Sequence, residues 1–372
     1  MRGSAALLAL AMLPLAGLAA AWRQAGPGYS WSFPRDHWSH PEYRIEWWYL
    51  TGTLADSRSP ARRFGYQLTF FRIGLLPEER GLDSLWSSGH LLMGHAALGD
   101  FSAGRHRFSD LLYRETPLLA GFGRFPDPRL VWSRAPAGTD AIWDLRWNGE
   151  GFDFRARDDE RRMAFDLTTR PIKPLVFQGP EGASRKGAGD AAASLYYSFT
   201  RLRTSGSLTL DGHTTPVQGE SWMDREFSTS RLKPDQVGWD WFALRLRDGR
   251  DLMLYRLRRK DGETEFRSAT LVSPRGKATY LSEDQWSIRA TASWKSQATG
   301  TVYPSGWQLE LPSESLRLTI IPWMQAQENI GRRSADLRYW EGAVLLRGPD
   351  GSHAGEGYVE LTGYGANNRP PV

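Results

Sequence analysis

Two acidic residues, Asp224 and Glu226, stand two positions apart in a run that also contains Trp222. If the run is a strand, side chains two apart share a face and lie about 6.6 Å from each other. Two carboxyl groups at that spacing can differ in pKa, so that one serves as an acid and the other as a base. The structural alternative is an arginine–carboxylate lattice closing a barrel, with Arg225 facing the other way.

A third acidic residue, Glu46, opens the aromatic run at residues 46–49. In a strand, Glu46 and Trp48 share one face, and Trp47 and Tyr49 share the other. A carboxyl beside an indole in an apolar cavity would have a raised pKa and could donate a proton. Alternatively, Trp48 fills the bottom of a barrel and Glu46 pairs with an arginine.

Three other acidic residues are less favoured. Asp240 lies between Trp239 and Trp241, and we do not expect it to share in the chemistry. We interpret Glu341, which follows Trp340, and Glu360 as structural. Groups with perturbed pKa values gather at functional sites, but structural ion pairs perturb pKa values as well.

The sequence lacks the residues that several kinds of catalytic and metal-binding site require. The chain has no cysteine, which excludes thiolate catalysis and cysteine metal sites. The pairs His37/His40 and His90/His95 lack a convergent third ligand, so we expect no metal and no other cofactor. Ser221 is not a nucleophile elbow, because Met223 stands where that motif needs glycine.

Charge and the first residues bear on location and partners. The 47 basic and 42 acidic residues give a net charge of +5 without a basic run, so we expect no nucleic-acid partner. Residues 1–21 resemble a cleaved secretory signal: an arginine, a short apolar run and three alanines. We therefore expect a periplasmic or secreted protein, and peripheral association with an inner-membrane complex stays open.

The elements that must position these residues are strands throughout. Short alternating runs are bounded by turn residues, and four Asp-Gly pairs are typical of hairpins. The alternating runs are residues 64–72, 143–147, 152–156, 163–169, 252–257 and 316–320. We find no capped helix of three turns, although a short helix is expected around residues 77–86 and a flexible loop at 179–190.

Four segments recur in the same order, which indicates a duplication. The separation between matched residues falls from 193 (Trp48 to Trp241) to 136 (Gly219 to Gly355), as it would if the first copy carried longer loops. We expect domains at residues 30–230 and 236–366, joined by a linker at 228–236. Sequential antiparallel strands favour up-and-down barrels that can enclose a ligand.

Five runs together resemble the AttH/CrtC family: residues 33–37, 46–52, 219–226, 238–242 and 339–342. The resemblance covers nearly all of the mature chain and implies two tandem lipocalin-like antiparallel β-barrels in an all-β protein. It is closest to the AttH branch, whose members are often called predicted secreted hydrolases. The CrtC branch hydrates carotenoids without a cofactor, but its catalytic positions cannot be matched here.

Three functions remain open. The first is an exported module that binds a long apolar ligand such as an isoprenoid or lipid. The second is a cofactor-free hydratase, isomerase or hydrolase in which Asp224, Glu226 or Glu46 protonates the ligand. The third is a carbohydrate-active protein. The residues expected to contact a ligand are Trp47, Trp48, Tyr49, His37, Trp222, Trp239, Trp241 and Trp340.

Overall fold

The computed structural model describes residues 21–77, 84–187, 192–229, 232–334, 337–365 and 368–370. Strands make up nearly all regular structure in these ranges, and the only helices are 3-10 turns at Arg35–His37, Pro180–Gly182 and Pro312–Glu314. The predicted all-β fold is therefore confirmed. Residues 1–20 of the predicted signal segment, 78–83 of the predicted short helix and 188–190 of the predicted loop lie outside the described ranges. Residues 77 and 84–86, the described ends of the predicted helix, are not helical.

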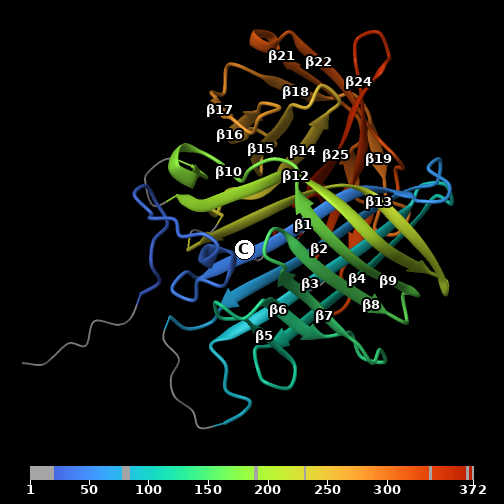
Figure 1. Cartoon of the computed structure of the whole chain (residues 1–372). Helices are drawn as coiled ribbons and strands as arrows, with labels where there is room; N and C mark the ends of the chain where they lie inside the picture. Colours follow the sequence, from blue (N-terminus) through green and yellow to red (C-terminus); the bar gives the residue numbers. More distant parts are fainter. Residues whose placement is uncertain are drawn as a thin grey trace, which may run out of the picture.

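The first sheet contains 13 strands, in the order β4-β3-β2-β1-β13-β12-β9-β8-β7-β6-β5, with β10 and β11 paired to β12. Neighbouring strands are antiparallel and the sheet curls into a nearly closed barrel (Figure 1). Its strands are β1 (Ile45–Asp56), β2 (Arg63–Gly74), β3 (His90–Asp100), β4 (Arg105–Arg114), β5 (Ala120–Phe122), β6 (Arg129–Arg134), β7 (Ile142–Trp147), β8 (Phe152–Asp158), β9 (Met163–Pro171), β10 (Val176–Phe177), β11 (Ala183–Arg185), β12 (Ala193–Leu210) and β13 (His213–Ser228).

The second sheet contains ten strands, in the order β17-β16-β15-β14-β25-β24-β22-β21-β18, with β23 paired to β24. A separate two-stranded ribbon joins β19 to β20. These strands are β14 (Gln236–Leu246), β15 (Asp251–Arg259), β16 (Thr264–Val272), β17 (Ala278–Leu281), β18 (Ser287–Ala290), β19 (Ser293–Lys295), β20 (Val302–Pro304), β21 (Trp307–Leu311), β22 (Leu316–Pro322), β23 (Glu328–Ile330), β24 (Arg338–Arg347) and β25 (His353–Leu361).

All four predicted Asp-Gly turns join antiparallel neighbours. In the β12–β13 hairpin, Asp211 and Gly212 both have positive φ, +53° and +80°, as a two-residue turn of the primed type requires. Each of the six predicted alternating runs also lies within a strand. Local periodicity and turn chemistry were therefore sufficient to find these elements.

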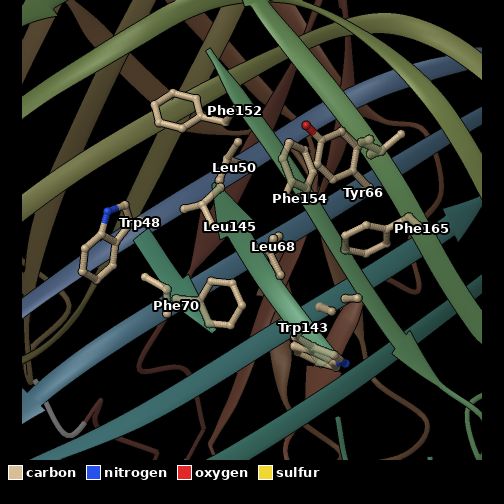
Figure 2. Packing of buried hydrophobic residues seen from close by; sticks show 14 of the residues in the cluster. Trp48, Leu50, Tyr66, Leu68, Phe70, Trp143, Leu145, Phe152, Phe154 and Phe165 are labelled. Carbon is tan, nitrogen blue, oxygen red and sulfur yellow. The ribbon is translucent and has the colours of Figure 1, made fainter. Parts of the chain in front are cut away.

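Each sheet encloses its own apolar core. The first core is rich in aromatic side chains from strands far apart in sequence, among them Trp48 of β1, Phe70 of β2, Trp143 of β7 and Phe154 of β8 (Figure 2). The second core contains Phe242 of β14 and further aliphatic and tryptophan side chains. A third apolar cluster, which includes Tyr49, Trp222 and Trp241, joins the outer faces of the two sheets.

The strand pairings correct one part of the expected repeat. In β1, Tyr49 lies opposite Asp224, and in β14, Trp241 lies opposite Glu360. Because Asp224 and Glu360 are matched in the repeat, Trp241 corresponds to Tyr49 and not to Trp48 as we predicted. The predicted pairing is one residue out of register, and a slip of one residue exchanges the two faces of a strand.

Candidate functional site

A cavity of about 160 Å³ lies between the outer faces of the two sheets. Its walls come from β1, β2, β3, β12 and β13 of the first sheet and from β14, β15, β24 and β25 of the second. Figure 1 shows these central strands where the blue-to-green sheet meets the orange-to-red one. The cavity therefore exists only because the two sheets pack together.

Strand β1 contributes Trp47 and Tyr49 to the cavity wall. Glu46 and Trp48 face the other way, and Trp48 is fully buried in the first core, where its ring N–H donates to the His37 carbonyl at 2.7 Å. The predicted division of this run into two faces is confirmed. It follows from strand alternation alone, since both faces of β1 are covered.

Strand β13 places Asp224 and Glu226 on the cavity side, as predicted. Asp224 is 3 % exposed and accepts three hydrogen bonds. The donors are Tyr196 at 2.6 Å, Ser198 at 2.5 Å and the ring N–H of Trp222 at 2.6 Å. Trp222 therefore contributes to the site indirectly, because its ring N–H holds the Asp224 carboxyl in position.

Burial raises the pKa of Asp224 to about 7, and the nearby charge of Glu226 acts in the same direction. The three donors oppose this shift because they stabilise the ionised form, but they do not cancel it. A carboxyl with this pKa is part protonated and part ionised at neutral pH. It can therefore give or take a proton, as a general acid–base catalyst must.

Among the residues that the structure describes, Glu226 forms an ion pair and Asp224 does not. The Nζ atom of Lys186 lies 2.8 Å from Glu226 Oε1 and 4.3 Å from the centre of the Tyr255 ring. This pairing raises the pKa of Lys186 against the opposing effect of burial. The two carboxyls of the predicted pair therefore have different environments, which is the condition for different roles.

The second sheet supplies a further carboxyl, Glu360 of β25, which we had interpreted as structural. Glu360 lines the cavity, and its Oε2 atom accepts a hydrogen bond of 3.2 Å from the ring N–H of Trp239. Burial raises the pKa of Glu360 to about 7, with added contributions from Asp224 and Glu226. The repeat contained the signal for this residue, because it matches Glu360 with Asp224.

His95 was considered in the sequence analysis only as a metal ligand, and it lines the cavity instead. His95 of β3 lines the wall with its Nδ1 atom 2.9 Å from the Tyr339 hydroxyl, and burial lowers the pKa of His95 to about 4, so it is neutral at pH 7. Trp239 and Trp241 of β14 were predicted and do line the cavity. The structure thus brings together Trp47, Tyr49, Trp239, Trp241, Asp224 and Glu226 of the predicted set, with Trp222 behind Asp224.

Four predicted residues lie elsewhere. Trp48 is in the first core, and Trp340 is in the second, where its ring N–H donates to the Gln325 carbonyl. His37 is buried against the first core with its Nδ1 atom 2.6 Å from the Tyr197 hydroxyl. Glu46 is fully buried on the side of β1 that faces away from the cavity. These positions correct the prediction that the four residues share one site with Asp224.

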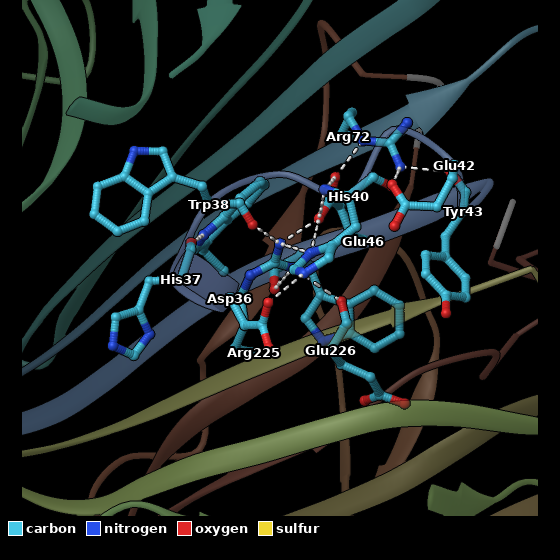
Figure 3. Close-up of polar contacts among 12 residues, drawn as sticks. Asp36, His37, Trp38, His40, Glu42, Tyr43, Glu46, Arg72, Arg225 and Glu226 are labelled. Atoms are coloured by element: carbon cyan, nitrogen blue, oxygen red, sulfur yellow. Dashed lines mark hydrogen bonds and ion pairs between the residues drawn. The ribbon is translucent and has the colours of Figure 1, made fainter. Parts of the chain in front are cut away.

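Glu46 forms the centre of a buried ion cluster at one end of the first barrel (Figure 3). Its two oxygens contact the guanidinium groups of Arg72 and Arg225 and accept the His40 backbone N–H. Arg225 also donates to the Trp38 carbonyl at 2.7 Å and lies 3.9 Å from the Trp48 ring centre. The cluster therefore holds the segment before β1, which contains Trp38 and His40, against β1, β2 and β13.

Of the two alternatives that the sequence leaves open for Glu46, a proton donor with a raised pKa is not the one that the structure shows. Burial acts in that direction, but Arg72 and Arg225 outweigh it and hold the pKa well below the usual range. The structural alternative, in which Trp48 fills the barrel and Glu46 pairs with arginine, describes the molecule. Glu46 stays ionised at neutral pH and cannot serve as a proton donor.

Neither a metal nor a membrane span is indicated by the described ranges. Within them, no group of three or more His, Asp or Glu side chains could hold a metal ion. No helix among the same residues is long and apolar enough to cross a membrane.

The fold and site define a class of protein: two lipocalin-like antiparallel sheets, the first a nearly closed barrel, with an acidic, aromatic-walled cavity between them. The AttH-like family matches residues 24–364, and the chain belongs to that family. A crystal structure of a putative AttH protein from Nitrosomonas europaea is similar, with 33 % identity and a TM-score of 0.79 over 91 % of this chain and 98 % of that one.

Two more distant relatives carry names that describe a reaction. Kievitone hydratase from Nectria haematococca shares the fold, with a TM-score of 0.63 and 13 % identity over 92 % of this chain and 96 % of that one. Dehydratase asqC from Emericella nidulans is 22 % identical over 206 residues. That match covers 52 % of this chain and 56 % of the dehydratase, so it spans little more than half of that relative.

Replacing Glu46 by Gln tests the ion cluster. The change leaves two buried guanidinium groups without a carboxylate, and we expect the free energy of unfolding, measured with urea, to fall by about 3–5 kcal/mol at pH 7. Glu310→Gln is the matched control, because Glu310 is exposed and pairs with Arg317 at 3.0 Å; we expect less than about 1 kcal/mol there. Equal losses in the two variants would contradict the assignment.

The Glu46 cluster also predicts a pH dependence. The pKa of Glu46 is lower in the folded protein than in the unfolded chain, so its stabilisation is complete above about pH 4.3 and is lost as the pH falls toward the folded pKa. Glu46→Gln should therefore be less sensitive than the wild type to acid between pH 5 and the onset of acid unfolding. A parallel decline in both proteins would argue against the cluster.

Asp224→Asn should have the opposite pH signature. The folded pKa of Asp224 is raised to about 7, so between about pH 4 and pH 7 the folded state holds a proton that the unfolded chain has lost. Stability therefore falls as the pH rises through this window, by up to roughly 4 kcal/mol. The variant removes this decline, and its Tm should exceed that of the wild type more at pH 8 than at pH 5. A constant Tm difference would place the pKa of Asp224 outside the window.

Proposed function

We propose that this protein is a cofactor-free enzyme that adds water to, or removes it from, a compact and largely apolar molecule in the cavity between the two sheets. The observation that carries the proposal is Asp224: a buried carboxyl on an aromatic wall whose pKa is raised to about 7 and which forms no ion pair with any described residue. The cavity, about 160 Å³, is smaller than common ligand pockets of roughly 300–1,000 Å³, which favours a compact ligand over a long chain.

In the hydration direction, protonated Asp224 gives its proton to one carbon of a carbon–carbon double bond. The other carbon becomes cationic, and the faces of Trp47, Trp239 and Trp241 stabilise that charge. A water oxygen bonds to the cation, and the proton that this water loses passes to ionised Glu360. Transfer of that proton from Glu360 to Asp224 completes the cycle, and the reverse sequence is a dehydration.

The names of two relatives support this reaction class. One is called a hydratase and the other a dehydratase, and these names describe the two directions of one reaction. The roles of Asp224 and Glu360, however, are derived from the contacts in this chain alone.

The exported carrier that we expected from the sequence would use the same cavity, with affinity supplied by burial of apolar surface. The raised pKa values of Asp224 and Glu360 favour the enzyme, because a carrier has no use for two carboxyls poised to exchange a proton. Export, and association with a membrane complex, remain predictions.

The test is turnover in water labelled with heavy oxygen. The protein is incubated with a panel of uncharged terpenoid alkenes, prenylated phenols and their tertiary alcohols, and products are identified by mass spectrometry. We expect label in an alcohol product, with turnover highest near pH 7, because it falls above that pH as Asp224 loses its proton and below it as Glu360 gains one. Asp224→Asn and Glu360→Gln should each lower turnover about 100-fold or more while leaving ligand binding intact.

The matched control is Glu310→Gln, an exposed carboxyl outside the cavity, which should keep full activity. Full activity in both Asp224→Asn and Glu360→Gln would remove the proposed acid–base pair. Ligand binding without turnover of any panel member would favour the carrier.

A further inference from the structure

Glu341 of β24 is a buried carboxyl that the reaction above does not use. It is 1 % exposed and lies directly opposite Glu360 on the neighbouring strand β25. Its Oε1 atom is 2.5 Å from the Tyr49 hydroxyl, and Tyr49 is part of the cavity wall. Glu341 therefore stands one side chain behind the cavity and contacts it through Tyr49.

The surroundings of Glu341 keep it neutral. In the part of the chain that the structure describes, no ion pair reaches Glu341, and its Oε2 atom has no hydrogen-bond partner. A buried carboxylate without a cation is far less stable than the neutral acid. Burial and the charge of Glu360 accordingly raise the pKa of Glu341 well above its usual range, and the contacts of Glu341 with Tyr49 and Gln67 oppose this shift without cancelling it.

If Glu341 is neutral, the position of its acid proton determines whether the Tyr49 hydroxyl donates to Glu341 or accepts from it. If the acid proton were on Oε2, Glu341 would have a buried O–H donor without an acceptor. If the proton is on Oε1, Glu341 donates it to the Tyr49 oxygen, and only the carbonyl oxygen Oε2 is left without a partner. Buried acceptors are left unpaired more readily than buried donors. The acid proton therefore lies between Glu341 and Tyr49, and the Tyr49 hydroxyl is free to donate elsewhere.

The direction open to Tyr49 is the cavity. Tyr49 and Asp224 are directly opposite each other on β1 and β13, so their Cβ atoms are about 4.5–5.5 Å apart on one face. A ligand oxygen bound by Tyr49 would thus hold the rest of the ligand beside the Asp224 carboxyl. Positioning of this kind is a large part of what an active site contributes.

The charges of the cavity restrict that oxygen to an uncharged group. Lys186 is the one Lys or Arg side chain among the described lining residues, and it is paired with Glu226. Asp224 and Glu360 add negative charge whenever they ionise, so an anionic ligand would be repelled.

We propose that Tyr49, held by Glu341, donates a hydrogen bond into the cavity, and that the molecule bound there carries an uncharged oxygen acceptor such as a ketone, an ether or a hydroxyl. This inference rests on the proposed function only for its location beside Asp224. It makes Tyr49 a ligand-binding residue and Glu341 a positioning residue. It also distinguishes the ligand from a pure hydrocarbon and from a fatty acid.

The probes are three saturated molecules of one carbon skeleton: p-menthane, its ketone menthone, and 4-isopropylcyclohexanecarboxylate. None has a carbon–carbon double bond, so binding is measured without turnover and the outcome does not depend on the proposed reaction. Affinity is followed at pH 7 by quenching of the fluorescence of Trp47, Trp239 and Trp241. We expect menthone to bind about tenfold more tightly than p-menthane, the value of one neutral hydrogen bond, and the carboxylate to bind more weakly than menthone.

Two variants separate the roles. Tyr49→Phe should lose the tenfold preference by weakening menthone alone, whereas a merely structural role would weaken both probes. Glu341→Gln should keep the preference, because its amide N–H still donates to the Tyr49 oxygen. If Glu341 were instead ionised in the wild type, Tyr49 would donate to it, and Glu341→Gln would gain a preference that the wild type lacks.

That gain would overturn the proposal, as would equal affinity of the wild type for menthone and p-menthane, or no binding of either. Glu310→Gln, far from the cavity wall, controls for the effect of a Glu→Gln change by itself. Loss of turnover in Asp224→Asn with the menthone preference intact would confirm both proposals separately.

Discussion

Strand β1 is buried on both of its faces, and the rest of the structure depends on that constraint. One face belongs to the apolar core of the first barrel and the other to the cavity between the two sheets. Each residue is assigned to one compartment by alternation, so Trp48 cannot enter the cavity and Tyr49 cannot leave it. The neighbouring strand β13 is under the same constraint, with Arg225 on the barrel side and Asp224 on the cavity side.

The two faces give their carboxyls opposite chemistry. On the barrel side, Glu46 is as buried as any residue in the chain, yet two guanidinium groups keep it ionised. On the cavity side, Asp224 has three neutral donors and no cation, and its pKa is raised instead. Burial is common to both residues, so the difference comes from their partners. Arg225 contributes to the difference between the two pKa values, because its guanidinium group lies on the barrel side of β13, next to Glu46.

Alternation, turn chemistry and the repeat were readable from the sequence, and they gave the strands, the faces of residues 46–49 and the shared face of Asp224 and Glu226. What the sequence could not give were the partners that a side chain meets on other strands. Arg72 lies directly opposite Glu46 on β2 and Arg225 lies on β13, and no local pattern shows that both guanidinium groups face this carboxylate. Lys186 was assigned to a flexible loop, but β11 (Ala183–Arg185) pairs with β12 immediately before it and brings its amine to Glu226. The repeat identified Glu360 as the counterpart of Asp224. A match in sequence, however, does not show which faces of the two sheets pack against each other.

The arrangement of the site explains why a match between Asp224 and Glu360 matters. The two residues occupy equivalent places in the two sheets, opposite Tyr49 and Trp241 respectively, and packing of the sheets directs both into one cavity. If the two halves arose by duplication, as the repeat indicates, Asp224 and Glu360 descend from one ancestral carboxyl residue. Neither half alone would hold the proposed pair, because Asp224 belongs to the first sheet and Glu360 to the second, and both sheets contribute tryptophans to the cavity wall. An acid–base site of this kind is therefore a property of the interface, and it forms only when the whole chain is folded.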